Sequence, residues 1–410
     1  MKISIIIPTH NRAESLKRAI DSISMLKDEA KFELIIVDNN STDHTKEVVE
    51  SYSGIARYVF EGSTSFTKAR GTGAENASGD IFLYLDDDVI VHPGSIREIA
   101  SVFSKYPDCG VIAGKILPQF EEEPPDWTLA CEQSFNGWSL MNPNIWPILG
   151  TGFQDFGSAC GPMMAIRKKP YFGVNGFPPD TVGVETNTRE NTFRKLYIGP
   201  GDYGLCHKIR KYGYKVYYSP RVSCYHVVLK VRLTVPFWRS RMIGEGHHKA
   251  ITNRELYNYS NRQLWLERIN AKYKYEYWKK MLYQRLKANE AYILKSNFSG
   301  MFFEELWVHY FKAYLDMDRI LLQNSGLSKF LWGIGLNGVA DNEFEQVVNK
   351  LPIEYLSITS SEKMYTEKLI ISIDTLESFG FPPSGNLLLL SKLFFYLISR
   401  IMIRVKKLLF

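Results

Sequence analysis

Residues 82–93 of the chain read FLYLDDDVIVHP, in which three adjacent aspartates interrupt an otherwise apolar segment. The aliphatic run before them has the composition of a buried β-strand that ends at residue 85. Carboxylates this close together repel one another and raise one another's pKa. A chain tolerates such a cluster where a cation neutralises it or where a turn leaves it in water. The segment therefore predicts a strand end that is either a cation site or a solvated turn.

The segments before this strand alternate between strand and helix patterns. Apolar residues recur at helical spacing over residues 15–25, and the polar residues 41–43 precede a second helix. Runs of aliphatic and β-branched residues predict four strands, at residues 2–7, 32–37, 55–60 and 81–85. This alternation predicts an α/β fold with a mostly parallel sheet and helices on both of its faces.

Polar clusters follow three of the predicted strands. They read PTHNR (8–12), DNNSTD (38–43) and DDD (86–88). In open α/β sheets, ligands bind outside the carboxyl ends of the strands, near the point where the strand order reverses. If the strand geometry continues past residue 85, Asp86 and Asp88 project to one side and Asp87 to the other. Mg²⁺ and Mn²⁺ commonly take one or two carboxylates plus phosphate oxygens, so the pattern favours a divalent cation site.

The character of the chain changes further along. Residues 118–147 lack a regular period and are expected to form a long functional or mobile loop. Its tryptophans offer faces on which a sugar can stack, although burial in a core is their commoner role. A helix is predicted at 203–212 and a strand at 215–218, and long helical segments begin near residue 234. We expect three parts, at residues 1–233, 234–385 and 386–410.

The composition is that of an ordinary globular protein, with 410 residues of which 45% are hydrophobic and 23% are charged. The formal net charge is +6, and most of the excess lies in residues 386–410, which contain five basic residues and no acidic one. A nucleic-acid-binding protein spreads its basic residues over one face of the fold. The charge distribution therefore argues against a nucleic-acid partner.

Residues 386–410 have helical spacing, with basic residues interrupting the apolar face. Such a helix lies in a membrane interface, or it packs on its own domain or on a second copy. We expect peripheral contact with the inner face of the cell membrane. The sequence contains no run of about 18 uncharged apolar residues, so no membrane-spanning helix is predicted. The apolar run at the N-terminus is too short for a signal peptide. Five cysteines without a CxxC pair indicate reduced thiols, so a cytoplasmic location is expected.

The order of the motifs resembles the family 2 glycosyltransferases, which have a nucleotide-sugar-binding GT-A fold. SIIIPTHNRAESLKRAIDSI (4–23) is similar to the opening strand and helix of that family, and ELIIVDNNSTDHT (33–45) to its second strand and nucleoside-contacting turn. ARGTGAENASGDIFLYLDDDVIV (69–91) resembles its Arg-containing helix and DxD strand. ACGPMMAIRK, GVNGFPP and GPGDYGLCHKIRKYGYKVYYSP follow in family order. The resemblance covers about residues 2–230.

The resemblance implies a set of residues that line the nucleoside pocket, namely Pro8, Thr9, Arg12, Asp38 and Asn39. Many relatives have a second aspartate at the position of Asn39. An amide oxygen still accepts a hydrogen bond from a base, so a UDP-sugar donor is expected while the base stays open. Arg70 is expected to reach the nucleotide or its phosphates, and from the sequence alone it is equally well a helix-surface arginine.

The resemblance also assigns the acidic cluster. Asp87 is expected to contact the ribose, and Asp86 and Asp88 to hold Mg²⁺ or Mn²⁺ against the donor diphosphate. His226 stands where many relatives place a third metal ligand, and an imidazole suits Mn²⁺ better than Mg²⁺. A lone histidine is more often structural, so both roles stay open for His226.

Asp202 is expected to be the general base of an inverting transfer, which takes the proton from the acceptor hydroxyl. Family members have the pattern EDxDL before a helix, whereas this chain reads Gly201-Asp202-Tyr203-Gly204-Leu205. The aspartate assigned as the base is kept, and glycine replaces both flanking acids. The alternative for Asp202 is the N-cap of the helix.

These residues together predict a metal-dependent inverting glycosyltransferase. It would move a sugar from a nucleotide-diphosphate donor to a glycan or a lipid-linked acceptor in surface polysaccharide synthesis. A catalytically silent binding or scaffold protein on the same fold is an alternative, because fold does not fix function. A sugar-phosphate nucleotidyltransferase is less favoured, because PTHNRAES (8–15) lacks the glycines of a phosphate-binding loop.

Overall fold

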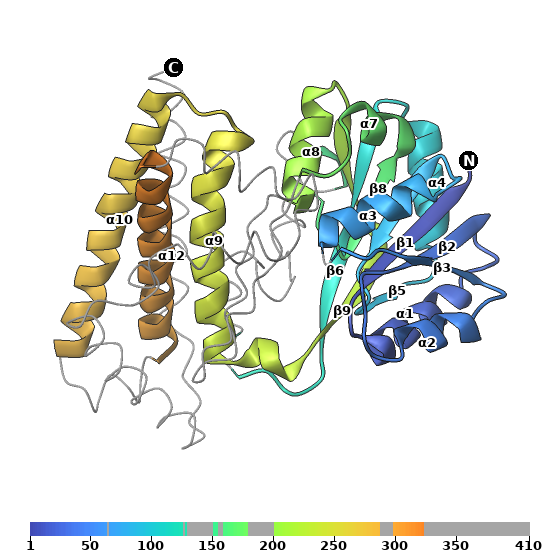
Figure 1. Ribbon diagram of the computed structural model, residues 1–410, viewed down its shortest axis with the longest axis horizontal. Coiled ribbons are helices and arrows are strands. Elements are labelled where there is room, and N and C mark those ends of the chain that lie inside the picture. Colours follow the sequence, from blue (N-terminus) through green and yellow to red (C-terminus); the bar gives the residue numbers. More distant parts are fainter. Residues whose placement is uncertain are drawn as a thin grey trace.

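The computed structural model of the protein describes residues 1–63, 65–125, 128, 151–154, 159–178, 201–287 and 298–323. The described part consists of one mixed β-sheet with helices on both faces and, beside it, a group of three long helices (Figure 1). The sheet is built from the first 228 residues, and the long helices follow it in the chain. This arrangement confirms the predicted α/β class with a helical C-terminal region.

The first part of the sheet is a parallel unit in which helices connect successive strands. Its elements in chain order are β1 (Ile3–Thr9), α1 (Ala13–Ser24), β2 (Phe32–Asp38), α2 (Thr45–Ser51), β3 (Ala56–Phe60), α3 (Phe66–Glu75) and β4 (Ile81–Leu85). The strands lie in the order β3-β2-β1-β4, and each neighbouring pair is parallel. All four strands predicted in this region are present, and β4 has the predicted bounds.

The second part of the sheet mixes parallel and antiparallel pairs. Its elements are β5 (Val89–Val91), α4 (Ser95–Lys105), β6 (Cys109–Phe120), β7 (Gly152–Gln154), β8 (Met163–Arg167), α7 (Lys168–Gly173), α8 (Gly201–Lys211) and β9 (Lys215–Val228). The sheet continues from β4 in the order β8-β6-β9-β5, and β7 pairs with β9. β9 is much longer than the strand predicted at 215–218, because it pairs with β6 along its length and then with β5.

Alternation along the central strands divides the core between the two faces of the sheet. In β1, Ile5 and Ile7 pack with α1, α2 and α4, whereas Ile6 packs with α3, α7 and α8. In β4, Leu83 belongs to the first cluster and Tyr84 to the second. These strands are therefore buried on both faces, which explains their nearly continuous aliphatic composition.

The helical region begins after a short 3-10 helix η1 (Lys230–Leu233). It comprises α9 (Val235–Glu255), α10 (Asn261–Lys287) and α12 (Phe298–Gln323), with α12 between the other two (Figure 1). The carboxylate of Asp318 in α12 is 1% exposed, and it accepts hydrogen bonds from Arg254 of α9 and Arg268 of α10, each at 2.5 Å. Truncating one partner of such a buried pair is costly, so this cluster fixes how the three helices pack.

The sheet and the helical region meet at an apolar contact. Val228 at the end of β9 packs with Leu233, Trp238 and Phe302, and Phe120 of β6 lies against the same cluster. The change from strands to helices falls at the boundary predicted after residue 233, while the assignment of 234–385 as a separate domain stays a prediction. The predicted loop at 118–147 begins later than expected, because β6 continues to Phe120. Most of that segment, including Trp127, and the predicted tail at 386–410 lie outside the described residues. In the described part, no helix is both long and apolar enough to cross a bilayer.

Candidate functional site

The strand order places the polar strand ends at one point. Between β1 and β4 the order of the parallel strands reverses, and crevices at such points bind ligands in open α/β sheets. Residues 10–12 leave β1 on this edge, and Asp86, Asp87 and Asp88 leave β4 beside them. Strand β4 ends at Leu85, and Asp87 and Asp88 form a turn before β5. The acidic cluster therefore lies at the position that the sequence predicted.

Asp87 links the ends of β1 and β4 across this reversal. Its Oδ2 accepts a hydrogen bond of 2.7 Å from the Oγ1 of Thr9, and its Oδ1 accepts one of 3.1 Å from Arg12. Asp87 is 6% exposed and Thr9 is 3% exposed. Burial raises the pKa of Asp87, although the adjacent Arg12 guanidinium opposes the effect. The solvated-turn interpretation of this cluster is therefore wrong for Asp87.

Asp88 is surrounded by basic side chains. Its Oδ2 accepts hydrogen bonds from Arg12 at 2.9 Å and from Arg232 of η1 at 3.4 Å, and Nε2 of His226 lies 3.4 Å from its Oδ1. The histidine reaches this position because His226 in β9 is the antiparallel partner of Val89, the residue that follows Asp88. Burial would raise the pKa of Asp88, but the charged guanidinium groups of Arg232 and Arg12 lower it. Asp88 is therefore ionised at neutral pH.

Arg232 and His226 also contact each other. A nitrogen of the Arg232 guanidinium lies 3.1 Å from Nε2 of His226. An arginine carries only donors, so Nε2 must be the acceptor and must carry the lone pair. Within the described residues, Oδ1 of Asp88 is buried and accepts no hydrogen bond. The guanidinium of Arg232 therefore lies beside two groups whose lone pairs are also suited to bind a divalent cation.

Asp86 belongs to a different network. It accepts a hydrogen bond of 3.2 Å from Arg70 of α3, and Arg70 also forms an ion pair with Asp202 of α8. The second oxygen of Asp202 accepts a hydrogen bond of 2.6 Å from the backbone N–H of Gly161. Burial raises the pKa of Asp86 to about 7, against the attraction of Arg70. Asp202 is thus connected through one arginine to the acidic cluster at the end of β4.

Arg70 is a buried residue, which excludes the alternative of a helix-surface arginine. The residue is 1% exposed, and its guanidinium lies 4.0 Å from the ring centre of Phe66 and 5.0 Å from that of Phe177. A guanidinium can stack on aromatic faces while its N–H groups bind carboxylates that lie in the plane of the guanidinium. The aromatic rings and the two carboxylates together fix the position of Arg70.

The turn after β2 forms the adjacent wall of the candidate site. Asp38 accepts hydrogen bonds from the Tyr58 hydroxyl at 2.7 Å and from the backbone N–H of Ser41 at 2.8 Å. The backbone N–H of Asn39 donates to the carbonyl of Thr9 at 2.8 Å, and its side-chain oxygen accepts from Ser65 at 3.2 Å. Asp38 and Asn39 are 3% and 6% exposed. Both predicted residues therefore adjoin the end of β1, and Pro8 lies within that strand.

The side on which each aspartate lies differs from the strand-based prediction. Asp87 and Asp88 share Arg12, whereas Asp86 turns to Arg70. The prediction of Asp86 and Asp88 on one side failed because the strand geometry ends at residue 85 and the next residues turn. Asp202 lies inside α8, in its first turn, so it is not the N-cap residue of this helix.

Sequence reasoning missed three of the residues that hold the site together. Tyr58 binds Asp38, Gly161 binds Asp202 through its backbone, and Arg232 binds both Asp88 and His226. The clearest sequence signal was for Arg232, which follows His226 by six residues in a segment with few acids. Tyr58 and Gly161 carry no comparable signal, because their roles depend on strand pairing and on backbone position.

Gly161 offers a direct test of this packing. A Cβ atom at residue 161 would lie 2.7 Å from Oδ2 of Asp202 and closer still to Arg70. We expect Gly161→Ala to lower the free energy of unfolding by about 1–3 kcal/mol, the usual cost of overpacking. Urea denaturation of the two proteins measures this difference.

Gly71→Ala is the matched control, because Gly71 lies in α3 and a Cβ there meets no atom within 4 Å. Alanine is a better helix former than glycine by about 1 kcal/mol, so this control is expected to be as stable as the parent or more so. Equal stability of Gly161→Ala and the parent would show that Arg70 and Asp202 can move apart without cost.

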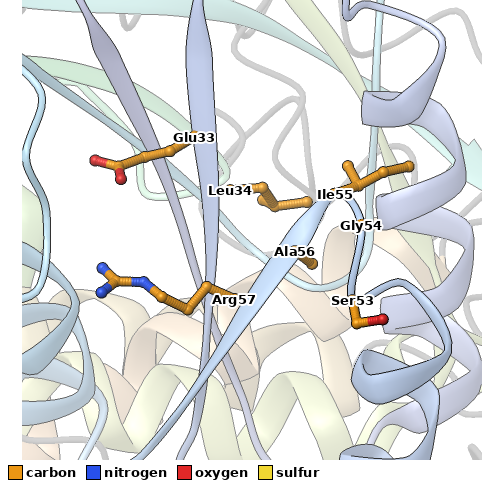
Figure 2. Close-up of a pocket in the computed structure, with 7 residues that line it drawn as sticks. All are labelled: Glu33, Leu34, Ser53, Gly54, Ile55, Ala56 and Arg57. Carbon is orange, nitrogen blue, oxygen red and sulfur yellow. The ribbon is translucent and has the colours of Figure 1, made fainter.

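A surface pocket lies elsewhere on the sheet. Its lining includes Glu33, Leu34, Ala56 and Arg57, at the beginning of β2 and of β3 (Figure 2). The acidic cluster lies at the other end of the parallel strands, beside the end of β2 at Asp38. The pocket is therefore on the edge of the sheet opposite to the candidate site, and none of the predicted site residues lines it.

Comparison with known proteins identifies the sheet region. Residues 4–171 match the model of glycosyl transferase family 2. Glycosyltransferase AglE of Haloferax volcanii is 33% identical over 107 residues, which are 25% of this chain and 35% of AglE. The glucosyl-dolichyl phosphate glucuronosyltransferase of the same organism is 19% identical over 264 residues, 61% of this chain and 77% of that enzyme. The chain thus spans about a third of the length of AglE and about three quarters of the length of the glucuronosyltransferase.

Two glycosyltransferases of known structure also match this chain, at low sequence identity. The mannosyltransferase PcManGT of Pyrobaculum calidifontis, in complex with GDP-Man and Mn²⁺, has a TM-score of 0.43 and 16% identity, over 90% of this chain and 84% of its own. Residues 1–349 of Staphylococcus aureus TarS, in complex with UDP-GlcNAc, have a TM-score of 0.43 and 13% identity, over 79% and 92% of the two chains. The family match and the α/β sheet agree with the predicted GT-A fold. Over residues 4–171, the sheet region of this chain matches glycosyl transferase family 2, the family that the order of its motifs predicted.

Proposed function

We propose that the protein is a metal-dependent inverting glycosyltransferase that uses a nucleotide-diphosphate sugar. The observation that carries this proposal is the convergence of Thr9, Arg12, the three aspartates and Asp202 at the strand reversal of a family 2 domain. A scaffold protein on this fold has no need to bury Asp87 and Asp88 against arginines, with a third carboxylate beside them, since buried charges are costly.

The donor nucleotide is proposed to lie against the ends of β1 and β2. Asp38 and Asn39 would face the base, with Thr9 and Pro8 beside it, and Asp87 would face the ribose. Arg12 and Arg70 supply positive charge near the phosphates, and a guanidinium matches phosphate geometry well. A UDP-sugar is the proposed donor, and Asn39 can accept a hydrogen bond from the uracil N–H.

The residues at the end of β4 fit a divalent cation that shares its coordination with the donor. Within the described residues, no three of the His, Cys, Asp and Glu side chains converge as a preformed metal site. Mg²⁺ and Mn²⁺ bound with nucleotides often take only one or two protein ligands. Asp88 and His226 would hold the ion, with Asp86 as a further carboxylate beside them. When bound, the ion neutralises charge on the departing nucleoside diphosphate.

Asp202 is proposed to accept the proton of the acceptor hydroxyl. In an inverting transfer, the acceptor oxygen attacks the anomeric carbon on the face opposite to the diphosphate, and the bond from that carbon to the diphosphate breaks. Asp202 is held by Arg70 and by the N–H of Gly161, and its side chain is 23% exposed. This partial exposure leaves the carboxylate accessible to an incoming hydroxyl.

The acceptor is proposed to be a glycan or a lipid-linked sugar used in surface polysaccharide synthesis. The relative that acts on glucosyl-dolichyl phosphate supports a lipid-linked acceptor, because it aligns over 61% of this chain. The proposed cytoplasmic location at the inner membrane face follows from such an acceptor, since nucleotide sugars are made in the cytoplasm.

The test is the release of nucleoside diphosphate from a panel of UDP-, GDP- and dTDP-sugars, with Mn²⁺ or Mg²⁺ and lipid-linked or glycan acceptors. We expect turnover with one donor class, loss of turnover in EDTA, and inversion of the anomeric centre in the NMR spectrum of the product. Donor binding without turnover for any acceptor would support the scaffold alternative. Retention of the anomeric configuration would contradict the proposed role of Asp202.

Arg232 is expected to compete with the metal ion. Its guanidinium contacts both Asp88 and His226, so a divalent ion must displace it from these groups. Hydrogen bonds to charged groups contribute about 1.5–3 kcal/mol, so removing them should tighten Mn²⁺ binding in the absence of nucleotide by about tenfold in Arg232→Gln. Electron paramagnetic resonance of free Mn²⁺ measures this affinity.

The matched control is Arg221→Gln, since Arg221 is an exposed arginine of β9, the strand that precedes η1. This control should bind Mn²⁺ as the parent does. An unchanged or weaker Mn²⁺ affinity of Arg232→Gln would mean that the ion binds away from the pair formed by Asp88 and His226.

A further inference from the structure

The longest of the described helices, α10, carries a stripe of exposed apolar side chains. Trp265, Ile269, Tyr273 and Tyr277 of α10 follow one another at four-residue spacing, and Leu266 lies beside them. Their exposed fractions are 53%, 47%, 70%, 43% and 43%, respectively. Side chains four residues apart lie on the same face of a helix. The stripe therefore extends along more than three turns of α10 on its outer face.

The inner face of α10 is already packed. Ala271 is 5% exposed and belongs to a cluster with Phe311 and Tyr314 of α12, and Tyr275 and Trp278 pack against the same cluster. In Figure 1, α12 lies between α9 and α10, so α10 is the outermost of the three helices. The exposed stripe is thus a second apolar face, in addition to the one that holds the helix in the protein.

The same outer face is basic. Arg262, Lys272 and Lys280 are exposed on it, at the two ends of the stripe and along its side. Glu276 is the one exposed acidic residue of α10 among the side chains that the structure describes. An apolar stripe with an excess of positive charge is complementary to a surface that has an apolar interior and negatively charged head groups.

We propose that the outer face of α10 docks on an anionic membrane surface. Tryptophan and tyrosine favour the boundary between headgroups and acyl chains, and long basic side chains extend to the headgroups while their stems stay on the apolar side. Anionic lipids attract each basic residue near the surface. The helix lies on the membrane and does not cross it, in agreement with the absence of a spanning helix in the described residues.

This surface is distinct from residues 386–410, for which the sequence predicts membrane contact. It is also distinct from the candidate site, because none of its residues belongs to the sheet. The proposal does not depend on the proposed transferase activity. Membrane docking and donor binding can therefore be tested separately on the same full-length protein.

The test is co-sedimentation of the full-length protein with vesicles of phosphatidylcholine alone or with one quarter phosphatidylglycerol. We expect the parent to bind the anionic vesicles at least tenfold more strongly than the neutral ones. The double variant Trp265→Ser/Tyr273→Ser and the double variant Lys272→Glu/Lys280→Glu should each bind the anionic vesicles at least tenfold more weakly.

Controls come from exposed residues of the sheet region. Met25 is 80% exposed, and Lys27 is exposed beside it, so Met25→Ser/Lys27→Glu changes similar chemistry far from α10 and should bind as the parent does. Thermal unfolding checks that every variant is folded. Parent-like vesicle binding by both α10 variants would overturn the proposal and assign membrane contact to another segment. The proposal would also be overturned if the parent bound no vesicles. If light scattering showed a dimer that the α10 variants dissociate, the stripe would instead bind a second copy of the chain.

Discussion

Replacing Asp88 by asparagine is expected to reduce sugar transfer by about 10³-fold or more. The carboxylate lies among Arg12, Arg232 and His226, and its free Oδ1 is the best-placed oxygen for a divalent ion. Metal ions contribute several kcal/mol of transition-state stabilisation, and about 4 kcal/mol corresponds to a 10³-fold change in rate. The release of nucleoside diphosphate and the affinity for Mn²⁺ should fall together in this variant.

The stability of the Asp88→Asn protein has to be measured in parallel. Removing one partner of a buried ion pair typically costs about 3–5 kcal/mol, because it leaves the remaining charges unpaired. Thermal unfolding separates this effect from a loss of function, and Asp28→Asn, at an exposed aspartate, is the control for the substitution itself. A folded Asp88→Asn protein with normal Mn²⁺ affinity and normal turnover would place the metal elsewhere.

Asp202→Asn is expected to lower the rate of transfer by about 10²–10⁴-fold while donor affinity changes little. General-base assistance has this magnitude, and an amide cannot take the proton of the acceptor hydroxyl. Among the described residues, Arg70 connects Asp202 to the proposed donor side of the site, because it also binds Asp86. Calorimetry with the nucleoside diphosphate measures donor binding, and single-turnover kinetics measure the rate of sugar transfer.

A matched comparison for this variant is Asp87→Asn, since we propose that Asp87 contacts the ribose of the donor and not the acceptor. It should weaken donor binding more than Asp202→Asn does, because its carboxylate joins Thr9 and Arg12 at the strand reversal. If Asp202→Asn instead keeps the parent's rate at saturating donor and acceptor, Asp202 serves only to hold Arg70, and another group is the base.

Much of the fold could be predicted from short-range patterns. The aliphatic run at 81–85 and its end at the aspartates were predicted with the observed bounds, because a strand buried on both faces has a nearly continuous apolar sequence. The helix at 13–24 was predicted within two residues for a similar reason, since only a helical period brings its apolar residues to one face. The length of β9 was not predicted, because its later residues are stabilised by pairing with β5 and β6.

The sequence predicted which polar residues lie at the ends of the strands, and it predicted their contacts less well. The sequence alone determined that three carboxylates follow a buried strand, and that polar ends of two other strands accompany them. Only the tertiary structure decided that Asp87 and Asp88 share Arg12 while Asp86 shares Arg70 with Asp202. Local sequence fixes hydrophobic period and strand ends, whereas the pairing of charges depends on which distant segments the sheet order brings together. Gly161, Tyr58 and Arg232 come from such segments, and their contacts exist only in the folded chain.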